Sequence, residues 1–157
     1  MTGYIVAIPS TVFLAFGVIQ GLTTDKFGKK GHLLTIGFAL MFIAHIIFLS
    51  FDICPSEERC YEGIFPMILI GFANTMIQLT LYPSVNYLVK EKYFGTAYGI
   101  IESATNIGMF VGSLLIGDIL NTNYAESKHV DIEQYHWVHI MLIIISFVSF
   151  LTSLKLN

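Results

Sequence analysis

Charged residues are scarce in this sequence. Asp, Glu, Lys and Arg together make up 12% of its 157 residues, whereas a soluble domain carries about 25%. So few charges cannot cover a surface that faces water, and the hydrophobic fraction is correspondingly high, at 55%. An ordinary soluble domain is therefore excluded, and an integral membrane protein is indicated.

Signals of several other functional classes are also missing. No cluster of Lys and Arg is dense enough to indicate nucleic-acid binding, and no phosphate-binding glycine-rich loop or metal-ligand cluster is present. The first residues lack the basic segment and the small-residue cleavage site of a signal peptide, so we expect the hydrophobic segments themselves to direct insertion. We therefore expect no enzyme activity, no cofactor, no metal and no nucleic-acid partner.

Five hydrophobic segments approach or exceed the ~20 residues that a helix needs to cross a bilayer. They cover about residues 4–22, 32–51, 64–89, 96–120 and 138–154. The third and fourth are longer than a minimal crossing, so we expect them to tilt or to protrude. The expected fold class is an all-α, multi-pass membrane protein, whose immediate partner is the lipid bilayer.

The basic residues are unevenly distributed among the loops between these segments. The first-to-second turn, the third-to-fourth turn and the C-terminal tail hold six, and the other two loops hold two. The six are Lys26, Lys29, Lys30, Lys90, Lys92 and Lys155, and the two are Arg59 and Lys128. Because short loops rich in Lys and Arg stay in the cytosol, we expect both lysine-rich turns and the C-terminus to be cytosolic.

Aromatic residues stand next to two of the segments. Tyr93 and Phe94 precede the fourth, and Tyr135 and Trp137 precede the fifth. Such rings favour the headgroup level of a bilayer, which agrees with the membrane assignment. Packing between helices is the alternative for any one of them.

Cys54 and Cys60 are the two cysteines of the sequence. They lie in the loop after the second segment, on the side opposite to the lysine-rich turns, where disulfides can persist. We expect a disulfide between them, which would close a small loop and stabilise it modestly. Two free thiols are the alternative, whereas a zinc site is not expected because two of its four ligands would be missing.

The turn between the first and second segments carries the most specific motif of the sequence. It reads Gly21-Leu22-Thr23-Thr24-Asp25-Lys26-Phe27-Gly28-Lys29-Lys30-Gly31. A glycine, three residues, an aspartate, a basic residue, a second glycine and further basic residues in this order resemble the signature loop of the major facilitator superfamily. Lysines stand here where arginines are common in that family, and an ordinary basic turn is the alternative.

The residue types of this motif have distinct physical roles. Gly21 lets a neighbouring helix approach closely because it has no Cβ, and Gly28 permits a tight turn. Asp25 is expected just beyond a helix end, where it can face the positive N-terminal end of an adjacent helix. Lys26 and Lys29 hold the turn in the cytosol. The resemblance implies a gating role, because in the superfamily this loop closes the cytosolic side of the carrier.

A second resemblance lies in the third and fourth segments. Leu81-Tyr82-Pro83-Ser84-Val85 and Phe94-Gly95-Thr96-Ala97-Tyr98-Gly99 are similar to the lysosomal dipeptide-transporter branch of the superfamily. In the superfamily the signature loop lies between helices two and three, with a weaker copy between helices eight and nine. One segment precedes the motif here, and four follow it before a tail that is expected to be cytosolic. The resemblance therefore favours the second copy and numbers the segments as helices eight to twelve, and the first-half copy is the alternative. Residues 1–157 are thus expected to form a partial domain, with five helices of the C-terminal six-helix bundle and without the N-terminal half.

The fourth segment contains an acidic residue, Glu102. A charge at the helix centre in a membrane costs roughly 2.5–3.5 kcal/mol, so such residues usually face a bundle interior or a water-filled cavity. Helical spacing places Asn106 on the face of Glu102, together with Gly99, Ser103, Phe110 and Ser113. We expect this face to line a substrate pathway, with Glu102 binding an ammonium group or a proton. A structural acid paired with a residue of the missing half is the alternative.

The third segment carries a polar stripe. Asn74, Gln78 and Tyr82 follow Gly71 at helical spacing. We expect these three side chains to contact the substrate, and hydrogen bonds between helices are the alternative. His45, in the second segment, is expected to be a hydrogen-bonded packing residue, and a proton relay is the alternative.

These resemblances imply the C-terminal portion of a secondary transporter that moves small organic solutes, dipeptides among them, by alternating access. Uniport and proton symport both remain open. The implied location is a lysosomal or other endomembrane, and the implied partners are a small-molecule substrate and the missing N-terminal half or other membrane subunits. The alternatives are a transport-inactive accessory subunit with a truncated carrier fold and a small membrane protein that self-associates.

Overall fold

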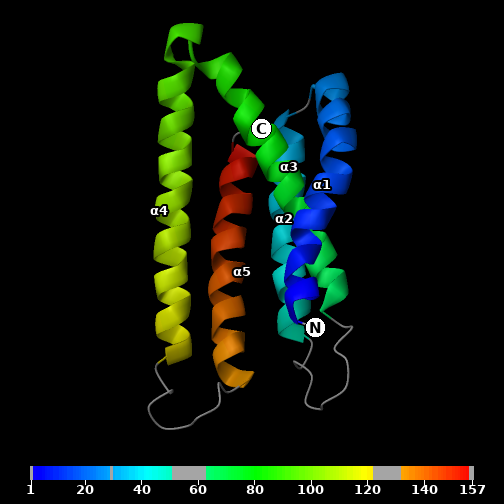
Figure 1. Ribbon diagram of the computed structural model, residues 1–157, viewed down its shortest axis with the longest axis vertical. Helices are drawn as coiled ribbons and strands as arrows, with labels where there is room; N and C mark the ends of the chain where they lie inside the picture. The colour runs from blue at the N-terminus through cyan, green and yellow to red at the C-terminus, as the bar shows by residue number, and fades with distance from the viewer. Residues whose placement is uncertain (1, 29, 51–62, 122–131, 156–157) are drawn as a thin grey trace. The chain divides into compact units, whose positions relative to one another are not determined.

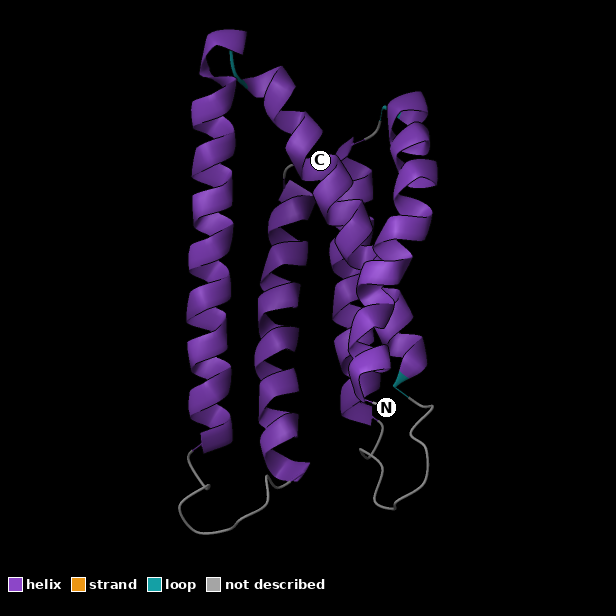
Figure 2. Cartoon of the chain, viewed as in Figure 1, coloured by secondary structure: helices purple, strands orange, loops and turns teal. Residues whose placement is uncertain are grey.

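The computed structural model describes residues 2–28, 30–50, 63–121 and 132–155, and these residues are almost entirely helical. Five long helices follow one another along the chain (Figures 1 and 2), with one short 3-10 helix before the fourth. They are α1 Thr2–Phe27, α2 Lys30–Ser50, α3 Ile64–Leu88, η1 Glu91–Tyr93, α4 Phe94–Asn121 and α5 Ile132–Lys155. All five α-helices are long and apolar enough to cross a membrane, which confirms the expected all-α membrane fold.

Two helix ends differ from the sequence-based expectation. The first helix continues to Phe27 instead of ending near Leu22. Thr24 lies within it and satisfies its hydroxyl by donating to the carbonyl oxygen of Gln20 at 2.8 Å. At the other end of the chain, α5 begins at Ile132. Tyr135 and Trp137 therefore lie inside this helix rather than before it.

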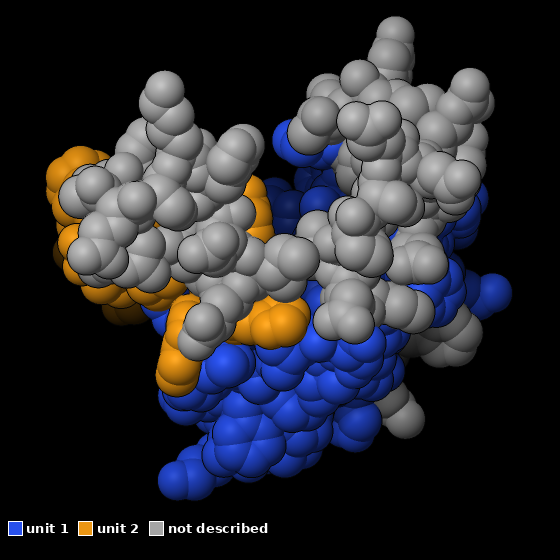
Figure 3. Space-filling view, turned by 90° about the horizontal axis from the view of Figure 1, so that it is seen from below, with its two compact units in different colours: residues 1–81, 139–157 blue, residues 82–138 orange. Residues whose placement is uncertain are grey.

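The described chain forms two compact units, which Figure 3 shows in different colours. Unit 1 comprises residues 1–81 and 139–157, and therefore holds α1, α2, most of α3 and most of α5. Unit 2 comprises residues 82–138, and therefore holds the end of α3, η1, α4 and the start of α5.

In unit 1, the backbones of α1 and α3 approach each other closely at Gly71. A Cβ placed on Gly71 would lie 2.7 Å from Cβ of Val12 and 3.0 Å from the carbonyl oxygen of Pro9. The rings of Phe16 and Phe72 pack beside this contact, with centroids 4.6 Å apart. Glycine is thus required at position 71, since small residues let membrane helices approach closely.

Within unit 1, α2 contacts both α3 and α5. A Cβ on Gly37 would lie 3.0 Å from Cγ1 of Ile77 and 3.1 Å from Cβ of Met76, so α2 is also closely packed against α3. Aromatic rings join α2 to α5, with Phe42 and Phe147 centroids 5.5 Å apart.

His45 takes part in the same α2–α5 contact. Its ring lies 5.7 Å from that of His139, and Phe48 stacks on His139 at 4.9 Å. His45 is buried, at 8% exposure. The structure thus gives His45 the packing environment expected of it, but its buried Nδ1 has no hydrogen-bond partner among the described residues, so the expected hydrogen bond is not made at this atom.

Unit 2 contains a helical hairpin in which η1 joins the ends of α3 and α4. Lys90 is extended, with φ −67° and ψ 144°, and its carbonyl oxygen accepts a hydrogen bond from the backbone N–H of Tyr93 at 2.9 Å. The Nζ atom of Lys92 lies 4.7 Å from the centre of the Tyr93 ring, a cation–π contact. This turn reverses the chain, so that residues on either side of it face one another.

No side chain of α4 between Phe94 and Leu120 is buried in the described structure. The small-residue pairs Gly95/Gly99 and Gly108/Gly112 have no atom within 4 Å of the position of a Cβ. The close helix packing that such pairs favour is therefore not made within unit 2.

Candidate functional site

The hairpin of unit 2 brings Tyr82 of α3 against Glu102 of α4. The phenol hydroxyl of Tyr82 donates to Oε1 of Glu102 at 2.6 Å, within the range of a charge-assisted O–H···O⁻ hydrogen bond. Among the described residues, this is the one hydrogen bond of Glu102, and no cation pairs with it. The carboxylate is thus oriented by one donor and keeps capacity for a further donor at its other lone pairs.

Glu102 sits in an apolar stretch of α4, beside exposed isoleucines such as Ile100 and Ile107. It lies eight residues after the first residue of the helix, about 12 Å along the axis at ~1.5 Å per residue. A lone carboxylate at this depth is costly in lipid, although less so than at the centre of a helix. A hydrogen-bond donor from the neighbouring helix reduces that cost, and a bound cation would reduce it further.

Tyr98 joins the same cluster from α4. Its hydroxyl lies 2.9 Å from Oδ1 of Asn86 and 3.2 Å from the carbonyl oxygen of Tyr82. A phenol has one proton, so these two acceptors share it. The rings of Tyr82 and Tyr98 are nearly parallel, with centroids 6.2 Å apart and an interplanar angle of 16°.

Sequence reasoning missed Tyr98 and Asn86 as parts of this cluster. The signal was present in the spacing: residues 82 and 102 are equidistant from Lys92, and so are residues 86 and 98. Two helices that turn back at η1 must therefore bring both pairs together. Without knowledge of where the turn lies, that symmetry cannot be recognised.

The expected substrate residues are divided between the two units. Tyr82, Glu102 and Asn106 belong to unit 2, where Tyr82 contacts Glu102 and the exposed Asn106 follows one helical turn later on the same face of α4. Asn74 and Gln78 belong to unit 1.

Asn74 and Gln78 pair with each other. The Nε2 atom of Gln78 donates to Oδ1 of Asn74 at 3.1 Å along one face of α3, and both side chains are half-buried. This intrahelical bond is a third possibility beside the two that the sequence suggested. Gly71, which begins the stripe, contacts Pro9 and Val12 of α1, so this end of the stripe is packed against protein.

The turn after α1 is built around Gly28. This residue has φ +63°, which is the left-handed region that glycine adopts without a steric penalty, and its N–H donates to the carbonyl oxygen of Thr24 at 3.0 Å. A left-handed glycine with such a bond is a common helix C-terminus. The tight turn expected at Gly28 is confirmed.

Two other residues of this motif are placed differently from the expectation. Asp25 lies in the last turn of α1 rather than beyond its end, because the helix continues to Phe27, and its side chain is exposed. No atom lies within 4 Å of a Cβ on Gly21, so no helix of the described chain makes the close approach expected there. Lys26 is exposed in the last helical turn, where a cation complements the helix dipole.

Two further sequence-based predictions fall outside the described residues. They concern Lys29 of the motif and the proposed disulfide between Cys54 and Cys60.

Comparison with known proteins adds a family to this geometry. The family described as Major Facilitator Superfamily matches residues 1–156. The chain is similar to proteins called lysosomal dipeptide transporter MFSD1, with 30% identity in Mus musculus, 31% in Bos taurus and 29% in Homo sapiens, each over 119 residues. These alignments cover 74% of this chain and 24% of each relative, so the matched part spans about a quarter of their length. No solved structure matches the chain.

Proposed function

Because the chain belongs to the Major Facilitator Superfamily, we propose that it forms the C-terminal part of a secondary carrier for small organic solutes. Carriers of this superfamily consist of two six-helix halves, with the substrate near the midplane between them, and work by alternating access. The five membrane-spanning helices supply most of one such half. In this proposal an N-terminal half completes the carrier, which agrees with the greater length of the relatives.

The substrate class that we propose is a solute with an ammonium group, such as a dipeptide. The observation that carries this proposal is the hydrogen bond from Tyr82 to Glu102, which orients a carboxylate on a helix that crosses the membrane. A free amino terminus is a compact cation that fits such a carboxylate. The relatives' name, lysosomal dipeptide transporter, supports the same class. A proton is the other cation that Glu102 can bind, and it would couple transport to pH.

In unit 2, Asn106 extends the proposed contact surface around Glu102 on α4. For unit 1 by itself, we propose that the amides of Asn74 and Gln78 on α3 are available to substrate. Asn106 lies one turn from Glu102 on its face and is exposed. Asn74 and Gln78 already satisfy one donor and one acceptor through their mutual bond, which leaves one acceptor and further N–H groups for a peptide substrate.

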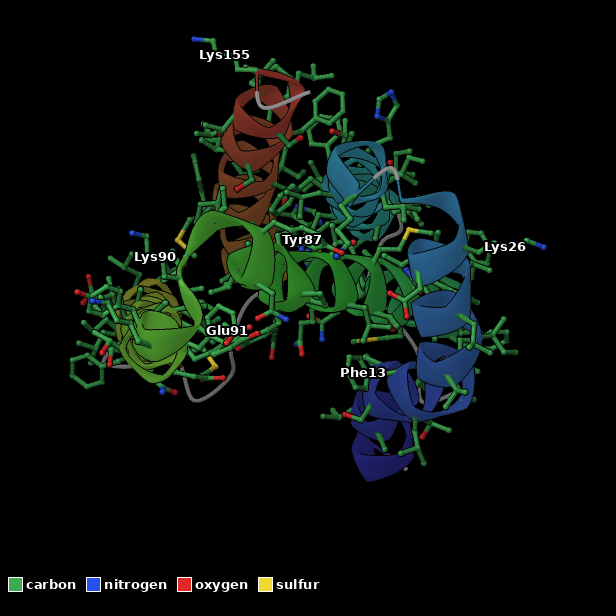
Figure 4. The ribbon with its side chains drawn as sticks, turned by 90° about the horizontal axis from the view of Figure 1, so that it is seen from above. Phe13, Lys26, Tyr87, Lys90, Glu91 and Lys155 are labelled. Atoms are coloured by element: carbon green, nitrogen blue, oxygen red, sulfur yellow. The ribbon has the colours of Figure 1, made fainter. Side chains whose placement is uncertain are left out.

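For the orientation, we propose that both lysine-rich turns and the C-terminus face the cytosol. Lys26 and Lys155 lie in the last turns of α1 and α5. The C-terminal ends of these two helices lie at the same end of unit 1 (Figure 1), and the two lysine side chains point outward (Figure 4). Lysines gathered at one end of a helix bundle are typical of the cytosolic side. The relatives' name favours a lysosomal membrane for this carrier.

For the motif after α1, we propose a gating role on the cytosolic side. Asp25 is exposed at the end of a helix whose own C-terminal dipole is negative. Its carboxylate is therefore better stabilised by a group outside its helix, such as the N-terminus of a helix in the N-terminal half. Gly28 fixes the direction of the chain after Asp25 through its left-handed turn.

The test is uptake of radiolabelled dialanine by the natural full-length protein reconstituted in liposomes. We expect Glu102→Gln to lower uptake by about 10- to 100-fold, the effect of losing an interaction with a charged group. The matched control is Glu91→Gln, which removes the same charge from the exposed η1 turn and should leave uptake unchanged.

Measurements at several pH values distinguish ammonium binding from proton coupling, because coupling makes uptake by the unmodified protein depend on an imposed pH gradient. Equal uptake by the Glu102→Gln and Glu91→Gln variants at every pH would contradict the proposal. Absence of uptake by the unmodified protein, together with stable co-purification of unrelated membrane subunits, would favour the accessory-subunit alternative.

A further inference from the structure

Beyond the residues that the carrier proposal uses, we propose that Tyr98 is a positioning residue that holds Tyr82, and through Tyr82 the carboxylate of Glu102, in the orientation that receives substrate. This inference rests on the proposed function of Glu102. Tyr98 makes no hydrogen bond to Glu102, so it acts through its neighbour. The Tyr98 hydroxyl contacts α3 at Asn86 and at the backbone of Tyr82, and both of these acceptors belong to unit 2.

The register of the hairpin in unit 2 aligns two pairs of residues. Tyr82 and Asn86 are one helical turn apart on α3, and Tyr98 and Glu102 are one turn apart on α4. The two helices run in opposite directions on either side of η1 (Figure 1), so Tyr82 meets Glu102 and Asn86 meets Tyr98. The two contacts form adjacent rungs between the helices. A change at the Tyr98 rung is therefore transmitted to the Tyr82 rung by one turn of helix.

The backbone of α3 contains a proline next to Tyr82. Pro83 lies inside α3, and proline removes one intrahelical hydrogen bond and crowds the preceding turn. Pro83 has no N–H to donate to the carbonyl oxygen of Leu79, so the helical turn that contains Tyr82 is weakened. The 3.2 Å contact from the Tyr98 hydroxyl to the Tyr82 carbonyl oxygen ties this weakened segment to α4.

The ring of Tyr82 lies beside the ring of Tyr98. The Tyr98 ring lies nearly parallel to it, at 6.2 Å between centroids, and thus limits its rotation toward that side. The Tyr82 hydroxyl is exposed to the remaining space of unit 2, since Tyr82 is not a buried residue. Among the described residues, the one hydrogen bond of the Tyr82 side chain goes to Glu102, which a substrate ammonium group must share, so the Tyr98 contacts supply a further restraint on Tyr82.

A kinetic experiment tests the effect on substrate binding. In the full-length protein in liposomes, Tyr98→Phe keeps the ring and removes the hydroxyl. We expect the KM for radiolabelled dialanine to rise about 2- to 10-fold, the change expected for one uncharged hydrogen bond, with the maximal rate nearly unchanged. The matched control is Tyr93→Phe on the same hairpin, whose aromatic ring still receives the Lys92 contact, and whose KM should not change.

A second variant separates positioning from general damage to the fold. Asn86→Leu removes the closer acceptor of the Tyr98 hydroxyl and should raise KM in the same way. Because the two residues act through one contact, the double variant should be no worse than Tyr98→Phe by more than about 2-fold, as coupled sites are not additive. Fully multiplicative effects of the two substitutions would overturn the inference.

A spectroscopic readout does not depend on transport. With 3-fluorotyrosine incorporated at position 82, the ¹⁹F resonance reports the surroundings of that ring in detergent-solubilised protein. We expect Tyr98→Phe to shift or broaden this resonance and Tyr93→Phe to leave it unchanged. An unchanged resonance in Tyr98→Phe would overturn the positioning role whatever transport shows. A changed resonance together with uptake that is insensitive to Glu102→Gln would leave the positioning role intact and refute the proposed function of Glu102.

Discussion

Replacing Gly71 by alanine is expected to destabilise the contact between α1 and α3. In Gly71→Ala, the new Cβ would lie 2.7 Å from Cβ of Val12 and 3.0 Å from the carbonyl oxygen of Pro9. Neither atom is at the end of a flexible side chain, since one is the first carbon of a side chain and the other belongs to the backbone. The substitution therefore forces α1 away from α3 and disturbs the Phe16–Phe72 contact beside it.

The size of the effect follows from two opposing contributions. Overpacking of a close contact costs about 1–3 kcal/mol, whereas replacing glycine by alanine within a helix returns about 0.5–1 kcal/mol. The free energy of unfolding should therefore fall by up to about 2 kcal/mol. In Gly37→Ala the new Cβ meets the side chains of Ile77 and Met76 at 3.0 and 3.1 Å and the carbonyl oxygen of Ala73 at 3.3 Å. These contacts are looser than those at Gly71, so a smaller loss is expected.

The control is Gly17→Ala on α1, where no atom lies within 4 Å of the new Cβ. This variant should be as stable as the unmodified chain or more stable by up to about 1 kcal/mol. The assay is unfolding in mixed micelles by titration with dodecyl sulfate, followed by circular dichroism. The expected order of stability is Gly17→Ala, then Gly37→Ala, then Gly71→Ala. Equal stability of the Gly71→Ala and Gly17→Ala variants would refute the close approach of α1 and α3.

Two further predictions concern the turn after α1. Gly28→Ala should destabilise the chain by about 1–2 kcal/mol in the same titration, because a residue with a Cβ is strained in the left-handed region. Gly28→Asn should recover part of this loss, because asparagine tolerates that region. Identical unfolding curves for the two variants would contradict the role of the φ +63° turn. Asp25→Asn in the full-length carrier should shift the population toward inward-open states, seen as faster reaction of cysteine probes on the cytosolic side, and unaltered probe accessibility would count against the gating role.

The sequence was sufficient to predict the five helices, because the length of an apolar segment is set by the thickness of the bilayer. Their ends were less accessible. The polar run that follows Leu22 is typical of a loop, yet Thr24 remains helical and its hydroxyl bonds to the carbonyl oxygen of Gln20 within the helix. Serine and threonine bonds of this kind are local, but their presence depends on whether the helix continues.

The candidate site was only partly predictable, for a related reason. Helical spacing on a single segment identified Glu102 and Tyr82 separately, but their pairing depends on the register of two helices, which η1 determines. Tyr98 and Asn86 have no distinguishing feature within their own helices. Similarly, the bond between Gln78 and Asn74 could not be predicted from the sequence. A polar stripe at helical spacing is equally compatible with contacts to a substrate, to a neighbouring helix or within the stripe itself.

The membrane topology of the full-length protein tests most directly whether α2 crosses the membrane and whether both lysine-rich turns lie on the same side. Single cysteines are introduced by Lys26→Cys, Lys90→Cys and Ser50→Cys in a background without the natural cysteines, and each is labelled with a membrane-impermeant maleimide in sealed vesicles. We expect Lys26→Cys and Lys90→Cys to react from the cytosolic side of the membrane and Ser50→Cys to react from the other side. Reaction of the Lys26→Cys and Ser50→Cys variants from the same side would contradict a membrane-spanning α2 and, with it, the carrier arrangement.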